Sequence, residues 1–183
     1  LFGSYIANNT VIKNAYGLYT AGNTTNMRGT VVNNISVGNT TNWAPTVNLL
    51  TFATKNVGES GDTPWVTSGG SSVNVDANWN GSTPLFIDYA NNDFRPYQSG
   101  GSTNANSALV VDTGSEYYSA LGYDIAGRER PDYMNGAAEY RDIGAHEFDH
   151  GFGPHPATHT LTLNNVVVGS RVGRSLCRFG TRM

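Results

Sequence analysis

The chain has 183 residues, a length that suits one domain or one and a half, and it carries a formal net charge of −3. Only 14% of its residues are charged, whereas Gly, Asn, Thr and Ser together supply 76 of the 183. This composition excludes a coiled coil or a helical bundle, which need Ala, Glu, Lys and Leu. It argues against a nucleic-acid binder, because no basic stripe is present to displace counterions. No apolar run approaches the roughly 18 residues of a membrane-spanning helix. The counts are typical of an extracellular β protein, secreted or on a cell or virion surface.

The cysteine count and the first residues bear on the context of the chain. The single cysteine, Cys177, excludes an intrachain disulfide framework. The chain begins at Leu1 with no initiator Met and no charged-then-apolar signal segment. We therefore expect a fragment or a mature piece, with further domains of the same polypeptide upstream.

The charges divide the chain into three zones. Residues 1–58 contain no Asp or Glu, residues 59–150 hold all 14 acidic residues, and residues 151–183 hold four Arg and no acid. We expect these zones to differ in architecture.

The first zone contains a repeat with an offset of 25 residues. The segment IANNTVIKN at residues 6–14 aligns with VVNNISVGN at residues 31–39, so that three Asn fall on Asn. A third, weaker copy with a shorter offset covers residues 47–56. Short β-rich runs with Asn at the corners predict a β-solenoid, with parallel strands and inward apolar stacks. Asn9 should then lie above Asn34 in an amide ladder, within about 10 Å. The alternative is an antiparallel sandwich with Asn-rich hairpins.

The second zone carries four motifs in a fixed order. They are TPLFID with NDFRP in residues 83–96, SALVVDTG at 107–114, DIAGRERP at 124–131 and DIGAHEF at 142–148. These motifs resemble the closing segment of bacterial right-handed parallel β-helix proteins, in which they read DPLFVD with DFRL, SPAIDAG, D-x-x-G-x-x-R-P and DIGAYE. The resemblance implies the pectin-lyase-like fold, in the anchor-bearing branch of large cell-surface proteins. The chain departs from the pattern at His146, usually Tyr, and at Ala108, usually Pro.

The charged residues of these motifs have a structural interpretation. We single out Asp93, Arg95, Asp112, Asp124, Arg130, Asp142 and Glu147. Short carboxylates at turn-like positions accept backbone N–H bonds, and Arg binds a carboxylate through two N–H groups. Asp142 should accept such bonds and hold the end of the solenoid closed. A calcium site is the alternative, but no D-x-D-x-D-G or G-G-x-G-x-D run supports it. We therefore assign no catalytic, cofactor-binding or metal-binding residue.

Residues 146–150 fit the zinc-protease pattern H-E-x-x-H, in which two His on one helix face bind the metal. The third His of the longer form of this pattern would fall at Pro156. Gly and Pro crowd the surrounding residues and disfavour a helix. We therefore expect no metalloprotease, although the four His between residues 146 and 159 leave open an adventitious metal site.

A carbohydrate-active enzyme is the main alternative to a noncatalytic module. Glycoside hydrolysis needs two carboxylates roughly 5–10 Å apart, and a polysaccharide lyase needs a base near calcium or another neutralising group. The first zone offers only Lys13, Arg28 and Lys55, with no acid. Exposed aromatic rings could stack on sugar faces, and packing between coils is the other interpretation of them. The aromatic residues concerned are Tyr16, Tyr19, Trp43, Trp65 and Trp79.

The third zone predicts a strand within residues 158–172, where Thr alternates with Leu and a run of Val follows. This strand resembles the opening of a small β-sandwich, and residues 173–183 receive no function. The predicted fold is all-β: a right-handed parallel β-helix in residues 1–82, its closing segment in 83–150, and a linker with a strand or tail in 151–183. The predicted function is a noncatalytic module of an extracellular bacterial or phage surface protein, for adhesion, display or contact with a polysaccharide or surface glycan. The alternative is the C-terminal part of a polysaccharide lyase or glycoside hydrolase.

Overall fold

The structure is a computed structural model, and it describes residues 4–19, 29–44, 50–99, 101–115, 122–128, 130 and 141–148. The chain divides into two compact units, residues 1–153 and 154–183, and every described residue lies in the first unit. The strand predicted within residues 158–172 and the tail at 173–183 lie outside the described residues. In the described part of the chain, no helix is long and apolar enough to cross a membrane.

Short β-strands make up most of the regular structure, and the helical element that the structure describes is one 3-10 turn. The expected all-β class is therefore confirmed. The strands are β1 (Ser4–Ala7), β2 (Thr10–Val11), β3 (Tyr16–Tyr19), β4 (Gly29–Val32), β5 (Ile35–Ser36), β6 (Thr41–Ala44), β7 (Leu50–Thr54), β8 (Asn56–Glu59), β9 (Ser72–Val75), β10 (Phe86–Asp88) and β11 (Asp93–Pro96), and the 3-10 turn is η1 (Ser107–Leu109).

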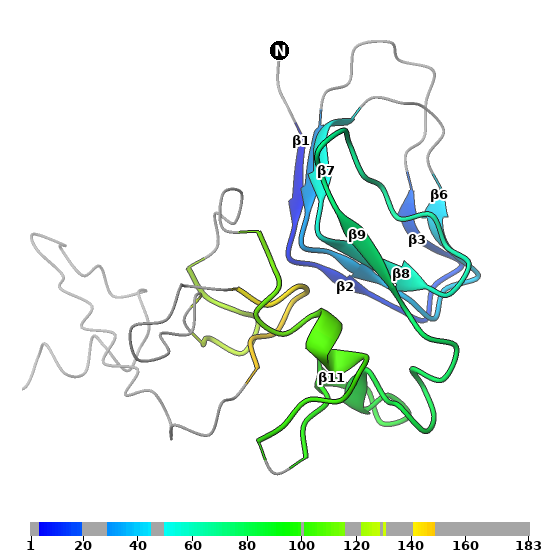
Figure 1. Cartoon of the computed structure of the whole chain (residues 1–183), viewed down its shortest axis with the longest axis vertical. Helices are drawn as coiled ribbons and strands as arrows, with labels where there is room; N and C mark the ends of the chain where they lie inside the picture. Colours follow the sequence, from blue (N-terminus) through cyan, green and yellow to red (C-terminus); the bar gives the residue numbers. More distant parts are fainter. Residues whose placement is uncertain are drawn as a thin grey trace, which may run out of the picture. The chain divides into compact units, whose positions relative to one another are not determined.

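The strands β1 to β9 form three sheets in which every described pairing is parallel (Figure 1). The strand orders are β1–β4–β7, β2–β5–β8–β9 and β3–β6, while β10 and β11 form a separate antiparallel pair. We call residues 4–19, 29–44 and 50–66 the first, second and third pass. Each pass thus contributes one strand to the first two sheets, and the first two passes also supply the third sheet.

The strand register confirms the repeat. In all three sheets the first pass pairs with the second at an offset of 25 residues, as in Ile6 with Val31. The weaker third copy pairs at an offset of 22, as in Val31 with Ala53. Residues 47–49, where that copy was expected to begin, lie outside the described residues. The antiparallel sandwich is wrong for β1 to β9, because their pairings are parallel.

The corner between the first two strands of each pass adopts a left-handed backbone. Asn8, Asn33 and Lys55 occupy equivalent positions there, with φ of 54°, 55° and 54°. Asn tolerates this conformation better than most residues, because its short polar side chain can bond locally. The next corner repeats the same device at Lys13 and Gly38, with φ of 59° and 66°. Asn and Gly at these positions therefore set where each pass turns.

An amide ladder runs beside the first corner, as predicted. The Nδ2 atom of Asn9 donates to Oδ1 of Asn34 at 2.9 Å, and Nδ2 of Asn34 donates to Oδ1 of Asn56 at 3.1 Å. The same two carbonyl oxygens also accept the backbone N–H of Asn9 and of Asn34, at 3.1 and 3.3 Å. Asn34 and Asn56 are fully buried. These bonds satisfy polar groups that would otherwise be costly inside the protein.

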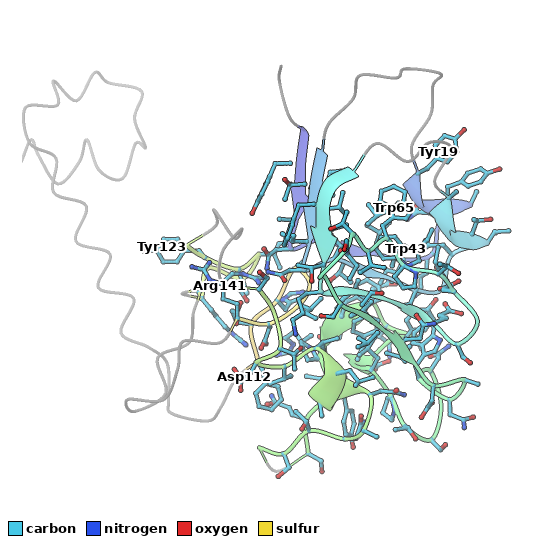
Figure 2. The ribbon with its side chains drawn as sticks, turned by 45° about the horizontal axis from the view of Figure 1, so that its top comes forward. Tyr19, Trp43, Trp65, Asp112, Tyr123 and Arg141 are labelled. Carbon is cyan, nitrogen blue, oxygen red and sulfur yellow. The ribbon has the colours of Figure 1, made fainter. Side chains whose placement is uncertain are left out.

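A first apolar cluster is formed by side chains from all three passes. Its buried members are Leu18, Val31, Trp43, Ala53 and Trp65. Trp43 and Trp65 meet edge to face with ring centroids 5.6 Å apart, and Figure 2 shows them side by side. Such aromatic pairs add to the stabilisation from burial alone. Of the two interpretations of these tryptophans, packing is therefore the one that the structure bears out, and Trp79 is also buried.

A second apolar cluster joins the sheet β2–β5–β8–β9 to the later part of the chain. Its buried members are Ile35, Val37, Val57, Val75, Trp79, Leu85, Phe86, Val110, Val111, Ile143 and Phe148. The backbone N–H of Gly144 donates to the carbonyl of Asn33 at 2.8 Å, and that of Ala145 to Oγ1 of Thr10 at 2.9 Å. The DIGA motif, expected at the end of the stack, is thus bonded to the first and second passes.

Candidate functional site

The residues predicted from the closing motifs gather around Asp142, which is 1% exposed. Its Oδ1 atom accepts the backbone N–H of Asp112 at 2.7 Å, and its Oδ2 atom accepts that of Phe148. The backbone of Asp142 also accepts from Asn8 Nδ2 at 3.4 Å. The prediction that this carboxylate accepts backbone N–H groups is confirmed. Asp142 therefore connects the segments around residues 112 and 148 and lies against the first corner.

Arg130 and Glu147 form a buried ion pair beside Asp142. The Nη1 atom of Arg130 lies 2.8 Å from Oε1 of Glu147, and the two side chains are 1% and 2% exposed. The contact is an ion pair by distance and not a well-aligned hydrogen bond, since Oε1 has no hydrogen-bond partner among the described residues. Arg130 instead donates from Nη2 to the carbonyl of Gly144 at 2.8 Å, and Glu147 accepts the N–H of Asp142 at 3.2 Å. The pair thus holds the DIGA turn from both sides.

Asp124 completes this network. Its two oxygens accept the backbone N–H groups of Arg128 and Glu147, at 2.7 and 3.0 Å. Arg128 in turn donates from Nη1 to the carbonyl of Glu147 at 2.7 Å. The D-x-x-G-x-x-R-P and DIGAHEF motifs are therefore interlocked through backbone bonds. We call Asp124, Arg130, Asp142 and Glu147 the buried charge network.

Burial shifts the titration of this network. Removal from water disfavours a charged carboxylate, so burial raises the pKa of Asp142 to about 7 and that of Glu147 to about 8. Burial also lowers the pKa of Arg130, against the pull of Glu147. Three carboxylates share one buried guanidinium, since Arg128 and Arg141 are only half-buried. Excess negative charge in a dry setting thus accounts for the retained protons.

Gly144 shows why the DIGA turn needs its glycine. Its φ is +101°, a region that side chains rarely adopt. A Cβ atom added there would also lie 2.6 Å from Cδ1 of Ile35 and 2.7 Å from Oγ1 of Thr10. The glycine therefore permits both the turn and its close approach to β2 and β5.

The remaining predicted residues lie elsewhere or play a different part. Asp93 and Arg95 face each other on β11 as a two-pronged pair, with Nε–Oδ1 at 2.8 Å and Nη2–Oδ2 at 2.5 Å. The bond from Arg95 lowers the pKa of Asp93. Asp112 contributes its backbone N–H to Asp142 and is half-buried with φ of 54°. Only four of the seven singled-out side chains therefore form the buried charge network.

The H-E-x-x-H match does not have the geometry of a zinc site in the residues described. Residues 141–148 contain no helix, and Glu147 is buried against Arg130. Burial lowers the pKa of His146, which is half-buried. His150, His155 and His159 lie outside the described residues. Within the described part of the chain, no group of three or more His, Cys, Asp or Glu could hold a metal ion.

Two contacts of the first pass were not anticipated from the sequence. Lys13 donates from Nζ to the carbonyl of Tyr89 at 2.8 Å and to Oδ1 of Asn92 at 2.6 Å. Its ammonium also lies 4.5 Å from the centre of the Tyr89 ring, a favourable cation–π distance. Asn33 exchanges two bonds with the backbone of Ser115, at 2.7 and 3.0 Å. The scarcity of Lys in the sequence was the available signal for the first contact.

The surface of β3 presents a pair of exposed aromatic rings. Tyr16 and Tyr19 are 59% and 51% exposed, with ring centroids 5.3 Å apart and planes inclined at 39°. Figure 2 shows Tyr19 at the margin of the described structure. We call these two residues the tyrosine pair. It differs from the three tryptophans, which are buried.

Comparison of the chain with protein-family models, with curated proteins and with solved structures finds no match. The assignment of function therefore depends on the residues and contacts described above.

Proposed function

We propose that the chain is a right-handed parallel β-helix module of an extracellular bacterial or phage surface protein, and that it serves adhesion, display or glycan contact without catalysis. The observation that carries the proposal is the constant offset between passes, with parallel pairing in all three sheets. Stacked passes of this kind form a stiff rod whose outer surface can vary without loss of the core. A rigid, chemically variable scaffold suits a protein that presents surfaces.

The buried charge network supports a structural part for the closing motifs. Each of Asp124, Asp142 and Glu147 accepts a backbone N–H, and these bonds join segments far apart in the chain. General acid–base groups need to reach a substrate proton, and these three carboxylates are at most 8% exposed. Their chemistry is therefore that of a latch, consistent with a noncatalytic module.

The tyrosine pair supports glycan contact as the binding activity. Two phenol rings held on a short strand offer apolar faces and polar tips at little cost in conformational entropy. The neighbouring positions carry uncharged polar groups, Asn14 before β3 and Thr41 opposite Tyr16. Residues 1–58 contain no Asp or Glu. A surface of phenols, amides and hydroxyls fits a sugar ring, which pairs C–H faces with hydroxyl groups.

A glycan-array screen combined with a polysaccharide-depolymerisation assay tests this function. Retention of a glycan with its chain length unchanged is the expected result. Shortening of a polysaccharide by the purified chain would contradict the noncatalytic assignment and favour the alternative, a carbohydrate-active enzyme. Absence of retention on every glycan tested would contradict glycan contact.

A further inference from the structure

The first pass ends all three sheets on the same side. Among the described strands, β1, β2 and β3 each occupy the edge of their sheet and pair only with the second pass. Backbone groups alternate in direction along a strand, and Asn8, Val11 and Ala15 already bond toward the second pass. The backbone groups of Ala7, Thr10 and Tyr16 therefore point away from it. An edge of this kind is a template for another strand.

The amide ladder has a direction, and it is open at the same edge. Asn34 Oδ1 accepts from Asn9, and Asn56 Oδ1 accepts from Asn34, so each ladder oxygen receives its donors from the preceding pass. A second ladder follows the same rule, since Asn39 Oδ1 accepts the N–H of Asn14 at 2.9 Å. Among the residues that the structure describes, the Oδ1 atoms of Asn9 and Asn14 have no donor. Both ladders thus lack a preceding member.

The apolar interior is also less covered at this edge. Ile6 and Val11 of the first pass are half-buried, whereas Val31, the partner of Ile6 in the second pass, is 1% exposed. Stacked repeats of this kind need a terminal cover for their apolar faces. Three independent features, the strand edges, the ladder oxygens and the apolar end, therefore coincide at the first pass.

We propose that the first-pass edge binds one further coil of the same repeat, supplied from the N-terminal side, whose three strands pair in parallel with β1, β2 and β3. The coil places an Asn over Asn9 and a second Asn over Asn14, and each donates to the oxygen below it. This inference rests on the β-helix of the proposed function, but not on glycan contact. The occupant is identified by continuity with the interface between the first and second passes.

The ladder polarity distinguishes this occupant from a second copy of the chain. A two-fold dimer through the same edge would bring the ladder acceptors of one copy against those of the other. It would also pair the strands antiparallel, unlike the sheets they extend. The open acceptors therefore match a preceding coil and not a symmetric partner.

The test is an extended chain in which a copy of residues 4–28 is inserted between Gly3 and Ser4, so that the offset of 25 is kept. A matched control carries the same insertion with its copies of Asn9 and Asn14 replaced by Ala. Hydrogen exchange at Ala7, Thr10 and Tyr16 should slow by about tenfold or more in the extended chain, because their amides gain acceptors. The denaturation midpoint should rise, and the Ala control should lose most of both effects.

Unchanged exchange at these three amides in the extended chain would overturn the proposal. So would a dimer of the unextended chain, seen by analytical ultracentrifugation, that already protects the same amides. Glycan retention is measured separately on the unextended chain, so that a failure of glycan contact leaves the result of the extension interpretable.

Discussion

At the scale of single residues, Asp142 is the side chain on which the closing segment most depends. Its two oxygens receive N–H groups from Asp112 and Phe148, and its backbone bonds to Glu147 and Asn8. Those partners belong to four separate parts of the sequence. A buried acceptor that serves several segments stabilises their arrangement more than a surface ion pair does.

Replacement of Asp142 should therefore destabilise the protein. Asp142→Ala leaves two buried N–H donors without an acceptor, and we expect a loss of about 2–4 kcal/mol in the free energy of unfolding. Asp142→Asn keeps one acceptor oxygen and should lose less. Urea denaturation of both variants measures the difference. An unchanged midpoint for Asp142→Ala would contradict the structural part assigned to this carboxylate.

The buried charge network should also make stability depend on pH. Unfolded Asp and Glu ionise near pKa 3.8 and 4.5, whereas burial holds Asp142 and Glu147 protonated up to about 7 and 8. The native state then binds more protons than the unfolded state between about pH 4 and 8, so the free energy of unfolding should fall as pH rises through that window. His146, whose pKa burial lowers, acts in the opposite direction near pH 6.

Glu147→Gln isolates the contribution of the network, and it should flatten this decline between pH 5 and 8. Asp88→Asn is the matched control. Asp88 is a surface carboxylate whose pKa is lowered by its bond to Asn91, so it stays ionised across the window. Denaturation at a series of pH values gives the slopes, and equal slopes for Glu147→Gln and the unchanged protein would refute the assignment.

At the scale of elements, the amide ladder fixes how the passes stack. Asn34 is the central member: its oxygen accepts two bonds from Asn9, and its Nδ2 donates to Ile6, Val32 and Asn56. Asn14, in contrast, is an exposed terminal member of the second ladder. The two asparagines thus differ in burial while sharing one type of interaction.

Asn34→Ala should lower the free energy of unfolding by about 2–4 kcal/mol, because it strands buried donors and acceptors in two neighbouring passes. Asn14→Ala should cost about 1 kcal/mol or less, since water can replace the lost bonds. Thermal unfolding of the two variants provides the comparison. If both lost the same stability, burial of the ladder would not be the source of its effect.

The repeat could be predicted from the sequence because each pass carries its own signals. Asn at the left-handed corners and apolar residues at the inward positions recur at a fixed offset, so that Asn8 and Asn9 find Asn33 and Asn34 without knowledge of the fold. The location of the DIGA turn could not be predicted, because it depends on contacts of Gly144 and Ala145 with residues more than 100 positions away. The sequence carries no local signal for such a contact. The tryptophans likewise have the same composition whether buried or exposed.

At the scale of the whole molecule, the described unit combines a stacked β region with a flanking segment held by buried charges. The stacked region leaves the tyrosine pair exposed on β3, away from the buried charge network in the contacts that the structure describes. Binding and structural integrity thus reside in different residues. Variants of one should leave the other unchanged.

The double variant Tyr16→Ala/Tyr19→Ala should weaken glycan retention by about tenfold or more, since stacking on two rings is lost. The free energy of unfolding should change by less than about 0.5 kcal/mol, because both rings are on the surface. Affinity chromatography on the retained glycan and urea denaturation give the two quantities. Trp43→Ala is the contrasting variant, which should unfold more readily because it empties the interior. Retention equal to that of the unchanged chain would exclude the tyrosine pair as the binding surface.

The parallel stacking of passes is the claim on which the proposed module and its further coil both rest. Nuclear Overhauser contacts between backbone protons test it most directly. Contacts should join Ile6 with Val31, Thr10 with Ile35 and Tyr16 with Thr41, all at the offset of 25 and in parallel register. Contacts that instead join β1 to β2 or β2 to β3 in antiparallel hairpins would contradict it.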